Sequence, residues 1–455
     1  MKIWQLYNLL GYWKKLTSGS VNRKIFGAAV TVGLLTVFVK VVGMAKELLV
    51  AQRFGTGDDI DAFLIALLIP SFIINIIAGS FSAALIPTYI QVREQEGKQA
   101  AQRLFSGVTV WGLGLLAITT ILMLVVAPLY LPMIAAGFER QKLDLTFHLL
   151  YALAPFILLS GINIIWSAVL NAGERFALAA FSPILTPGIT IVLLLGFESW
   201  RTFILAAGLV CGTAVEIVIL GIGLKRQKIS LFPNWYGFNP SLRQVISRFL
   251  PTVAGSLLMS STVIVDQSMA AMFPTGSVAA LSYGNRIIAL PITLATTALS
   301  AAVIPYFSKM VAHQDWKSIH HTLQYYLRLI FIVTVPITII FIVFSELIVR
   351  ILFQRGSFTA NDTQLVAQIQ SCFALQIPFY IAGRLGVHLI LSMRNNHILM
   401  WGSLFNLIIN IVLNYLFSQW MGIAGIALST SFVYIFSFSL LLAYNLKALS
   451  QKQSI

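Results

Sequence analysis

The sequence predicts an all-α integral membrane protein, with about twelve transmembrane helices in two pseudo-symmetric six-helix bundles around a central cavity. Composition is the first observation behind this prediction. Of the 455 residues, 58% are hydrophobic and only 10% are charged, and the mean hydropathy is +0.87. Soluble domains do not reach such values. The second observation is a series of apolar runs, separated by short polar loops, that leaves no room for a sizeable soluble domain.

Each predicted helix is an apolar run bounded by charged or turn-forming residues, and most runs reach the roughly 20 residues that a bilayer requires. In chain order they lie near residues 25–50, 61–90, 107–134, 145–170, 177–197, 203–224, 248–273, 278–308, 323–353, 364–393, 399–417 and 422–446. The polar stretch 225–247 is the one substantial internal linker. We therefore predict an N-terminal bundle over residues 1–224 and a C-terminal bundle over residues 248–455, joined by a cytoplasmic linker over 225–247.

Lys and Arg residues are distributed unevenly over the predicted loops. If the N-terminus is cytoplasmic, most of them lie on the cytoplasmic side, and the other side holds Arg53, Arg140, Lys142, Arg201, Arg350 and Arg355. Because cytoplasmic loops carry an excess of Lys and Arg, we expect both termini in the cytoplasm. This rule also explains the formal charge of +15 without a nucleic-acid partner. The first residues lack the pattern of a removable signal peptide.

An internal repeat is the third observation. Phe54-Gly-Thr-Gly57 precedes the second predicted helix, which contains Ser82-Ala-Ala-Leu-Ile-Pro87, and Phe273-Pro-Thr-Gly276 precedes the eighth, which contains Ser300-Ala-Ala-Val-Ile-Pro305. A further pair matches Pro155-Phe156 and Gly161 with Pro378-Phe379 and Gly383. Both matches are six helices apart, which predicts two parallel halves related by an axis along the membrane normal. Shared helix-ending residues are the alternative explanation.

Charged side chains inside the predicted spans are the candidate functional residues, because a charge in hydrocarbon usually faces a cavity or a partner. They are Lys40, Lys46 and Glu47 in the first helix, Asp61 at the start of the second, Asp266 in the seventh and Arg286 in the eighth. Lys40 and Glu47 are seven positions apart and share a helix face. We therefore consider Glu47 a charge partner for Lys40, and Asp266 a second candidate partner for a buried cation.

Cations in the first and eighth helices would line facing halves of one cavity, and such a cavity favours an anionic substrate. Lys40, Lys46, Asp61 and Arg286 are accordingly the predicted substrate-binding residues. An alternative interpretation is that the two lysines extend to the headgroups and that Asp61 is only a helix N-cap. Asp266 and Arg286 lie about two turns from the nearest predicted loop, which fits this alternative poorly.

Other motifs do not indicate an enzyme. Gly112-Leu-Gly114 resembles a dinucleotide fingerprint but lies inside an apolar span. Cys211 and Cys372 also lie in apolar runs and form no disulfide or zinc pattern. A membrane-embedded glycosyltransferase would need carboxylates as a base or as metal ligands. Asp58, Asp59 and Asp61 are the only carboxylate cluster in the sequence that could serve. We expect no catalytic residue, no metal and no cofactor.

Several strings resemble the MurJ (MviN) family of lipid II flippases, within the multidrug/oligosaccharidyl-lipid/polysaccharide exporter superfamily. They are Gly43-Met-Ala-Lys46, Asp61-Ala-Phe63, Arg248-Phe-Leu-Pro251, Phe273-Pro-Thr-Gly-Ser277, Tyr283-Gly-Asn-Arg286, Leu290-Pro291, Ile304-Pro305, Phe353-Gln-Arg-Gly-Ser-Phe-Thr-Ala360 and Gly422-Ile-Ala-Gly-Ile-Ala-Leu-Ser-Thr430. The strings follow the family order over nearly the whole chain. The resemblance is therefore specific at the level of the family.

The resemblance implies a V-shaped pair of bundles in the bacterial plasma (inner) membrane. The protein would move an undecaprenyl-diphosphate-linked peptidoglycan precursor, lipid II, from the inner to the outer leaflet by alternating access. It also implies that Lys40, Lys46 and Arg286 engage the diphosphate and that Asp61 matches a family carboxylate. In the first helix this sequence has Lys where the family usually has Arg. The charge is kept, but the two-pronged guanidinium geometry that suits a phosphate group is lost. The chain also departs from the family at the uncharged Asn75 and Ala289, and its twelve predicted spans do not include two further C-terminal helices.

Alternative functions remain open at this point. The cargo could be another polyprenyl-diphosphate-linked oligosaccharide, such as an O-antigen or exopolysaccharide unit. Cation-coupled drug export predicts an acidic cavity, and the basic residues argue against it. The sequence has no nucleotide-binding motif, so the expected partners are the glycolipid, membrane lipid and, if an ion gradient drives transport, a coupling ion. A scaffold without transport would tolerate neutral residues in the cavity.

Overall fold

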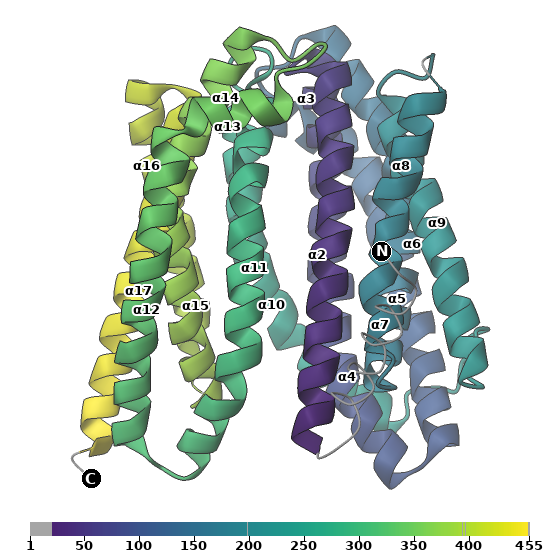
Figure 1. The fold of residues 1–455 in the computed structure, drawn as a ribbon. Coiled ribbons are helices and arrows are strands. Elements are labelled where there is room, and N and C mark those ends of the chain that lie inside the picture. The colour runs from purple at the N-terminus through teal and green to yellow at the C-terminus, as the bar shows by residue number, and fades with distance from the viewer. Residues whose placement is uncertain (1–20, 198, 394, 396, 454–455) are drawn as a thin grey trace, which may run out of the picture.

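The computed structural model describes residues 21–197, 199–393, 395 and 397–453. The expectation about a signal peptide falls on residues 1–20, which lie outside this range. Within the described residues, eleven helical segments are long and apolar enough to cross a membrane. The 34-residue helix α2 (Val21–Phe54) runs beside them (Figure 1). Together these segments correspond to the twelve predicted spans.

The first half of the chain contains α2 to α9. After α2 come α3 (Asp58–Ile73), the π-helix η1 (Ile74–Ala78), α4 (Gly79–Gln95), α5 (Lys98–Ile134), α6 (Arg140–Ala172), α7 (Phe176–Phe181), the 3-10 helix η2 (Ser182–Ile184), α8 (Leu185–Gly196) and α9 (Phe203–Arg226). The second predicted span is therefore a helix with a π-helical turn in its middle. In that turn Asn75 is the exposed residue, while its neighbours Ile74 and Ile76 are buried.

The second half contains α10 to α17. These helices are α10 (Pro240–Ala270), α11 (Ser277–Ala312), α12 (Trp316–Val343), α13 (Ser345–Phe353), α14 (Ala360–Ala374), α15 (Gln376–Ser392), α16 (His397–Met421) and α17 (Ile423–Gln453). Two spans predicted as single helices, 323–353 and 364–393, are each divided in two. Pro378 lies in the first turn of α15, where it has no N–H to bond back to the end of α14, which accounts for the second division.

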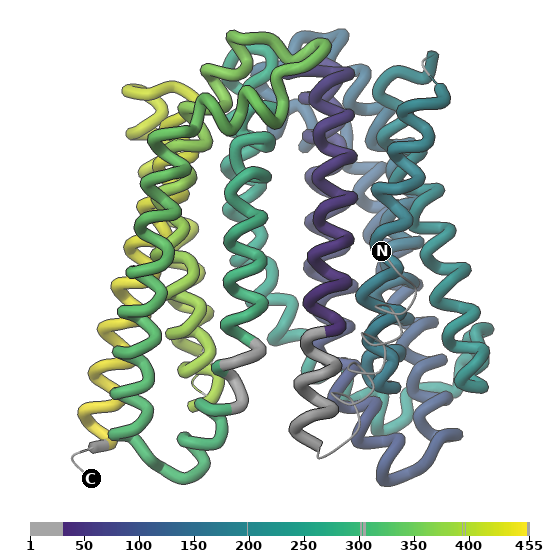
Figure 2. Tube along the Cα trace, in the orientation of Figure 1, coloured from purple at the N-terminus to yellow at the C-terminus, as the bar shows by residue number. Residues whose placement is uncertain are grey.

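The helices form two groups side by side (Figures 1 and 2). In the first group, α6 packs between α9 and α3, and in the second α17 packs against α16, α15 and α14. Helix α10 contacts both groups, since it lies against α4 and α5 as well as α16. Helix α2 begins, and helix α17 ends, at the same end of the molecule. This arrangement places α2 and α11 next to each other at the centre.

Small residues permit close packing where apolar burial cannot hold helices together in lipid. Gly208 and Gly212 of α9 lie four positions apart and face α8. A Cβ added at Gly208 would lie 2.4 Å from Oγ1 of Thr190, and one at Gly212 would lie 2.5 Å from Cα of Thr186. Only glycine fits this contact, which fixes α8 against α9.

Candidate functional site

The two helix groups are joined at one end of the molecule by the loops after α2, α10 and α13. We call this junction, which lies at the top of Figures 1 and 2, the closed end. The Ser357 amide donates a hydrogen bond to the Gln52 carbonyl at 2.8 Å, and the Ser357 hydroxyl donates to the Arg53 carbonyl at 3.0 Å. The Tyr283 hydroxyl donates to the Gly55 carbonyl at 3.2 Å. Backbone groups of the two halves therefore bond directly to one another.

Glycines make this backbone contact possible. Gly55, Gly276 and Gly356 have φ values of +57°, +89° and +58°, the left-handed region that other residues rarely adopt. A Cβ at Gly276 would lie 2.3 Å from the carbonyl oxygen of Thr56. The repeated strings Phe54–Gly57 and Phe273–Gly276 thus pack against each other, and both immediately precede a long helix.

Asp61 lies at the centre of the closed end and is 1% exposed. Its carboxylate accepts hydrogen bonds from the amides of Gly276 at 2.7 Å and Ala279 at 2.8 Å, where α11 begins. It also lies 2.8 Å from the Lys142 ammonium, which pairs with Asp58 at 2.7 Å as well. Asp61 therefore caps the first turn of a helix from the other half, where a negative charge is favoured.

This placement differs from the expectation that Asp61 lies with the substrate-binding cations. Its cation is Lys142, which follows Asp61 by 81 positions in the sequence, and no local pattern indicates that pairing. Arg286 lies ten positions after Gly276 in the same helix, a rise of about 15 Å. In this state Asp61 is part of the closed end, at a different depth from Arg286.

Lys46, Glu47 and Arg286 form an ion cluster between α2 and α11. The Glu47 carboxylate pairs with Lys46 on its own helix and with Arg286 on the other. The side chains of Lys46, Glu47 and Arg286 are 22%, 13% and 30% exposed, so all three are accessible in part. Two of the predicted cations are therefore brought together, with one carboxylate between them.

Lys40 is not the partner of Glu47, contrary to the sequence-based pairing. A separation of seven positions is a rise of about 10 Å, too far for the two side chains to meet, although they share a helix face. Lys40 is exposed, on the face of α2 from which Glu47 contacts α11. It lies about two turns further from the closed end than the ion cluster.

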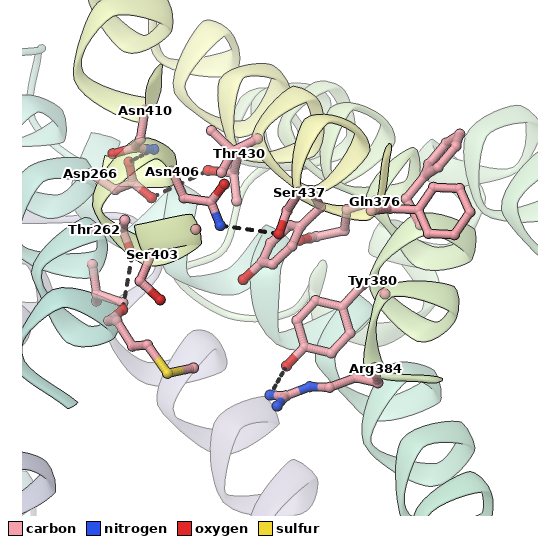
Figure 3. Close-up of a pocket in the computed structure, with 18 of the residues that line it drawn as sticks. Thr262, Asp266, Gln376, Tyr380, Arg384, Ser403, Asn406, Asn410, Thr430 and Ser437 are labelled. Atoms are coloured by element: carbon pink, nitrogen blue, oxygen red, sulfur yellow. Dashed lines mark hydrogen bonds between the residues drawn. The ribbon is translucent and has the colours of Figure 1, made fainter. Parts of the chain in front are cut away.

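Asp266 has polar neutral partners instead of the cation that the sequence analysis considered. Its carboxylate accepts hydrogen bonds from the Asn410 amide at 3.0 Å and from the Thr430 hydroxyl at 3.2 Å (Figure 3). It also accepts one from the Asn414 amide at 2.7 Å. Asn410 and Asn414 are 1% and 0% exposed. The Asn414 Oδ1 atom is buried and has no hydrogen-bond partner among the described residues. This group concentrates oxygen atoms inside the second half.

Glu216 forms a second buried polar group, which the sequence analysis did not single out. It lies in α9, is 5% exposed, and accepts hydrogen bonds from Asn163 of α6 and Thr186 of α8. Glu216 was detectable as an acidic residue in an apolar run, since such a residue is rarely without a partner. Its partners could not be detected in the same way, because Asn163 and Thr186 lie 53 and 30 positions away in the sequence.

Metal-binding clusters of three or more His, Cys, Asp or Glu residues are absent from the described part of the chain. Both cysteines are free. The carboxylates that the glycosyltransferase interpretation requires are engaged in ion pairs. Asp58 and Asp61 pair with Lys142, and Asp59 pairs with Arg201 at 3.3 Å.

Known proteins resemble this chain in both sequence and structure. The family profile described as lipid II flippase MurJ matches residues 50–455. A probable lipid II flippase MurJ from Synechocystis is 25% identical over 93% of this chain and 82% of the relative. A lipid II flippase MurJ from Burkholderia cenocepacia is 25% identical over 89% of this chain and 80% of the relative.

Among solved structures, the inward closed conformation of a lipid II flippase MurJ covers 91% of this chain and 87% of its own length, with a TM-score of 0.79 and 22% identity. An inward-facing multidrug resistance MATE transporter of the MOP superfamily covers 93% of this chain and 99% of its own, with a TM-score of 0.75 and 15% identity. These likenesses confirm the predicted fold class. Because the family profile matches most of the sequence, this multi-pass membrane protein belongs to the lipid II flippase MurJ family.

Proposed function

We propose that this protein is a flippase for an undecaprenyl-diphosphate-linked peptidoglycan precursor, lipid II, which it moves from the inner to the outer leaflet by alternating access. The observation that carries the proposal is the cluster of Lys46, Glu47 and Arg286 between the two halves. Two cations from facing helices suit a diphosphate, which bears negative charge on both phosphates. Membership of the family supports the same substrate class.

The Glu47 carboxylate gives this cluster a mechanism. With no substrate, it forms ion pairs with both cations, whose burial without a partner would be costly. The three side chains together keep one net positive charge. A diphosphate that enters between α2 and α11 replaces Glu47 as the partner of Arg286 and Lys46, so that the cations are paired both with and without substrate. Lys40 lies on the same face of α2, about two turns further from the closed end, and would attract the diphosphate before it reaches the cluster. The prenyl tail can stay in the lipid.

The direction of transport follows from the predicted topology. If both termini are cytoplasmic, the closed end is the outer end, and substrate enters from the cytoplasmic side. Along α2, Val50 and Ala51 near the closed end are 2% and 0% exposed, whereas Leu34 and Phe38, nearer the start of the helix, are 57% and 53% exposed, so α2 is open at the end from which substrate would enter. We place the protein in the bacterial plasma membrane, with residues 1–224 and 248–455 as the two halves that move.

A coupling ion is the second element of the proposal. Asp266, Asn410, Asn414 and Thr430 supply oxygen atoms from three helices, and reorienting either amide group would turn a further oxygen toward the centre. Hard monovalent cations and protons bind to oxygen-rich groups of this kind. Binding there would draw α10, α16 and α17 together and so bias the conformation of the second half. No catalytic step is needed for transport.

The test is rescue of cells depleted of their own lipid II flippase, with an assay for lipid II in the outer leaflet. Wild-type protein should rescue, whereas Arg286→Ala and Lys46→Ala should not, at equal membrane abundance. Arg328→Ala is the control, since Arg328 is an exposed cation on α12, away from the cluster. Rescue by both cluster variants would reject the diphosphate contacts. Failure of the wild type, with restored export of a different polyprenyl-linked glycan, would reject lipid II as the cargo.

A further inference from the structure

A cavity of about 340 Å³ lies within the second half, between α10, α11, α15, α16 and α17 (Figure 3). Asp266 with Asn410 and Thr430 forms one part of its wall, and Arg384 of α15 forms another. Polar and aromatic side chains line the space between them, namely Asn285, Tyr380, Asn406, Tyr434 and Ser437. A cavity of this size and mixed lining is typical of sites for small organic groups.

Arg384 is a cation that lines this cavity from a membrane-spanning helix. Its guanidinium donates a hydrogen bond to the Tyr380 hydroxyl at 2.8 Å and lies 5.1 Å from the centre of the Tyr380 ring. Over the described residues, Arg384 forms no ion pair, whereas Arg286 and Lys142 each pair with a carboxylate. The hydroxyl accepts one of the five N–H groups of the guanidinium. The others remain available to a ligand.

A cation in a membrane-spanning segment that lines a cavity and has no ionic partner indicates a binding site for an anion. The planar guanidinium matches the two oxygen atoms of a carboxylate. Tyr380 and Tyr434 pack edge to face with ring centres 4.8 Å apart, and the Asn406 amide donates to the Ser437 hydroxyl at 3.1 Å. Rings and amides of this kind bind the faces and hydroxyl groups of sugars and the backbone of peptides.

The cavity adjoins the proposed diphosphate site through helix α11. Asn285 lines the cavity, and the next residue, Arg286, pairs with Glu47 on α2. Consecutive residues of a helix point about 100° apart, so α11 presents one side chain to each site. A single ligand that bears a diphosphate at one position and a carboxylate at another can therefore occupy both sites around α11.

We propose that this cavity binds the carboxylate-bearing peptide portion of the transported headgroup, with Arg384 as the contact to a carboxylate. The inference rests on the proposed function, since a peptidoglycan precursor carries a short peptide on its disaccharide. The volume suits a fragment of the headgroup and not the whole of it. The site would give the protein a preference for peptide-bearing lipids over other polyprenyl-diphosphate-linked glycans.

The experiment measures binding of two lipids to the purified full-length protein in lipid nanodiscs. One is lipid II, and the other is the same prenyl-diphosphate disaccharide without its peptide. The variants are Arg384→Gln, Arg384→Lys and Arg286→Gln, and Arg328→Gln is the control at an exposed cation. Thermal unfolding of each variant establishes that it is folded. Wild type should prefer lipid II about tenfold, the order of magnitude of one charge-assisted hydrogen-bonded pair.

Arg384→Gln should abolish this preference by weakening lipid II binding alone, and Arg384→Lys should retain part of it. Arg286→Gln should weaken both lipids equally, and Arg328→Gln neither. If Arg384→Gln weakens both lipids equally or neither, or if wild type has no preference, the inference is overturned. A selective effect of Arg384→Gln without any effect of Arg286→Gln would support the cavity and overturn the diphosphate site. Binding of neither lipid by wild type would overturn both proposals.

Discussion

The two halves are joined differently at the closed end and along α10. At the closed end the contacts are mainly hydrogen bonds and ion pairs, and they depend on glycine backbones and on the buried Asp61–Lys142 pair. Along α10, Phe249 stacks on Phe81 of α4 with ring centres 4.3 Å apart. Two hydrogen bonds accompany this stack. Arg248 donates to the Thr88 hydroxyl at 3.1 Å, and Ser80 and Ser256 lie 3.4 Å apart.

This difference suggests that the closed end acts as a conformational switch and that the contacts along α10 act as a hinge. Apolar stacking tolerates small sliding motions, because it has no directional requirement. A buried ion pair that caps a helix is either made or broken, so the closed end is suited to two discrete states. We therefore expect that substitutions at the closed end shift the conformational equilibrium strongly, and that comparable substitutions along α10 do so weakly.

Asp61→Ala should have the largest effect. It leaves Lys142 buried beside Asp58 alone and removes the cap from α11. Breaking one member of a buried pair typically costs about 3–5 kcal/mol, which corresponds to a population shift of roughly two to four powers of ten toward an open junction. Spin labels at Trp200, between α8 and α9, and at Asn361 of α14, which are exposed and belong to different halves, would report a longer distance. An unchanged distance distribution would contradict the role of Asp61 as a lock.

Gly276→Ala should have the next largest effect. The substitution places a methyl group against the Thr56 carbonyl and forces alanine into a positive φ, for a cost of about 1–3 kcal/mol. Gly237→Ala is a matched control, because Gly237 also has a positive φ, +74°, but has no atoms within 4 Å of the added Cβ. With the same spin labels, Gly276→Ala should open the junction and Gly237→Ala should not. Equal behaviour would show that backbone strain alone matters.

Glu47→Gln tests the centre of the molecule, between these two regions. It leaves Lys46 and Arg286 without their shared counter-ion, so anion affinity should rise about three- to tenfold, while contact between α2 and α11 weakens. Calorimetric titration with a short-chain prenyl diphosphate at two salt concentrations would measure the gain, which salt should reduce. Glu346→Gln on α13 is the control for loss of an exposed carboxylate. A loss of affinity would mean that Glu47 positions the cations and does not compete with the ligand.

The sequence predicted the fold because span length and apolar composition decide it locally. The repeat Phe54–Gly57 and Phe273–Gly276 predicted two related halves, but it did not predict that the two strings pack against each other at the closed end, as they do in the structure. The partners of the charged residues were not predictable in the same way. Lys40 and Glu47 share a face but are too far apart along the helix, and Lys142 is distant from Asp61 in sequence. Ion pairs between helices depend on how the helices pack in space, and the periodicity of the sequence does not predict that packing.

Arg248→Gln should have the smallest effect and completes the comparison. Arg248 is exposed, and its hydrogen bond to Thr88 is one of several contacts that hold α10 on α4. An exposed contact of this kind contributes at most about 1 kcal/mol, so the closed-end distance distribution should change by less than the Gly276→Ala variant changes it. Phe249→Ala serves as the positive control, because loss of a large buried ring costs about 3–5 kcal/mol. It should lower thermal stability without opening the closed end. If Arg248→Gln opened the closed end as far as Asp61→Ala does, α10 would be part of the switch and not its hinge.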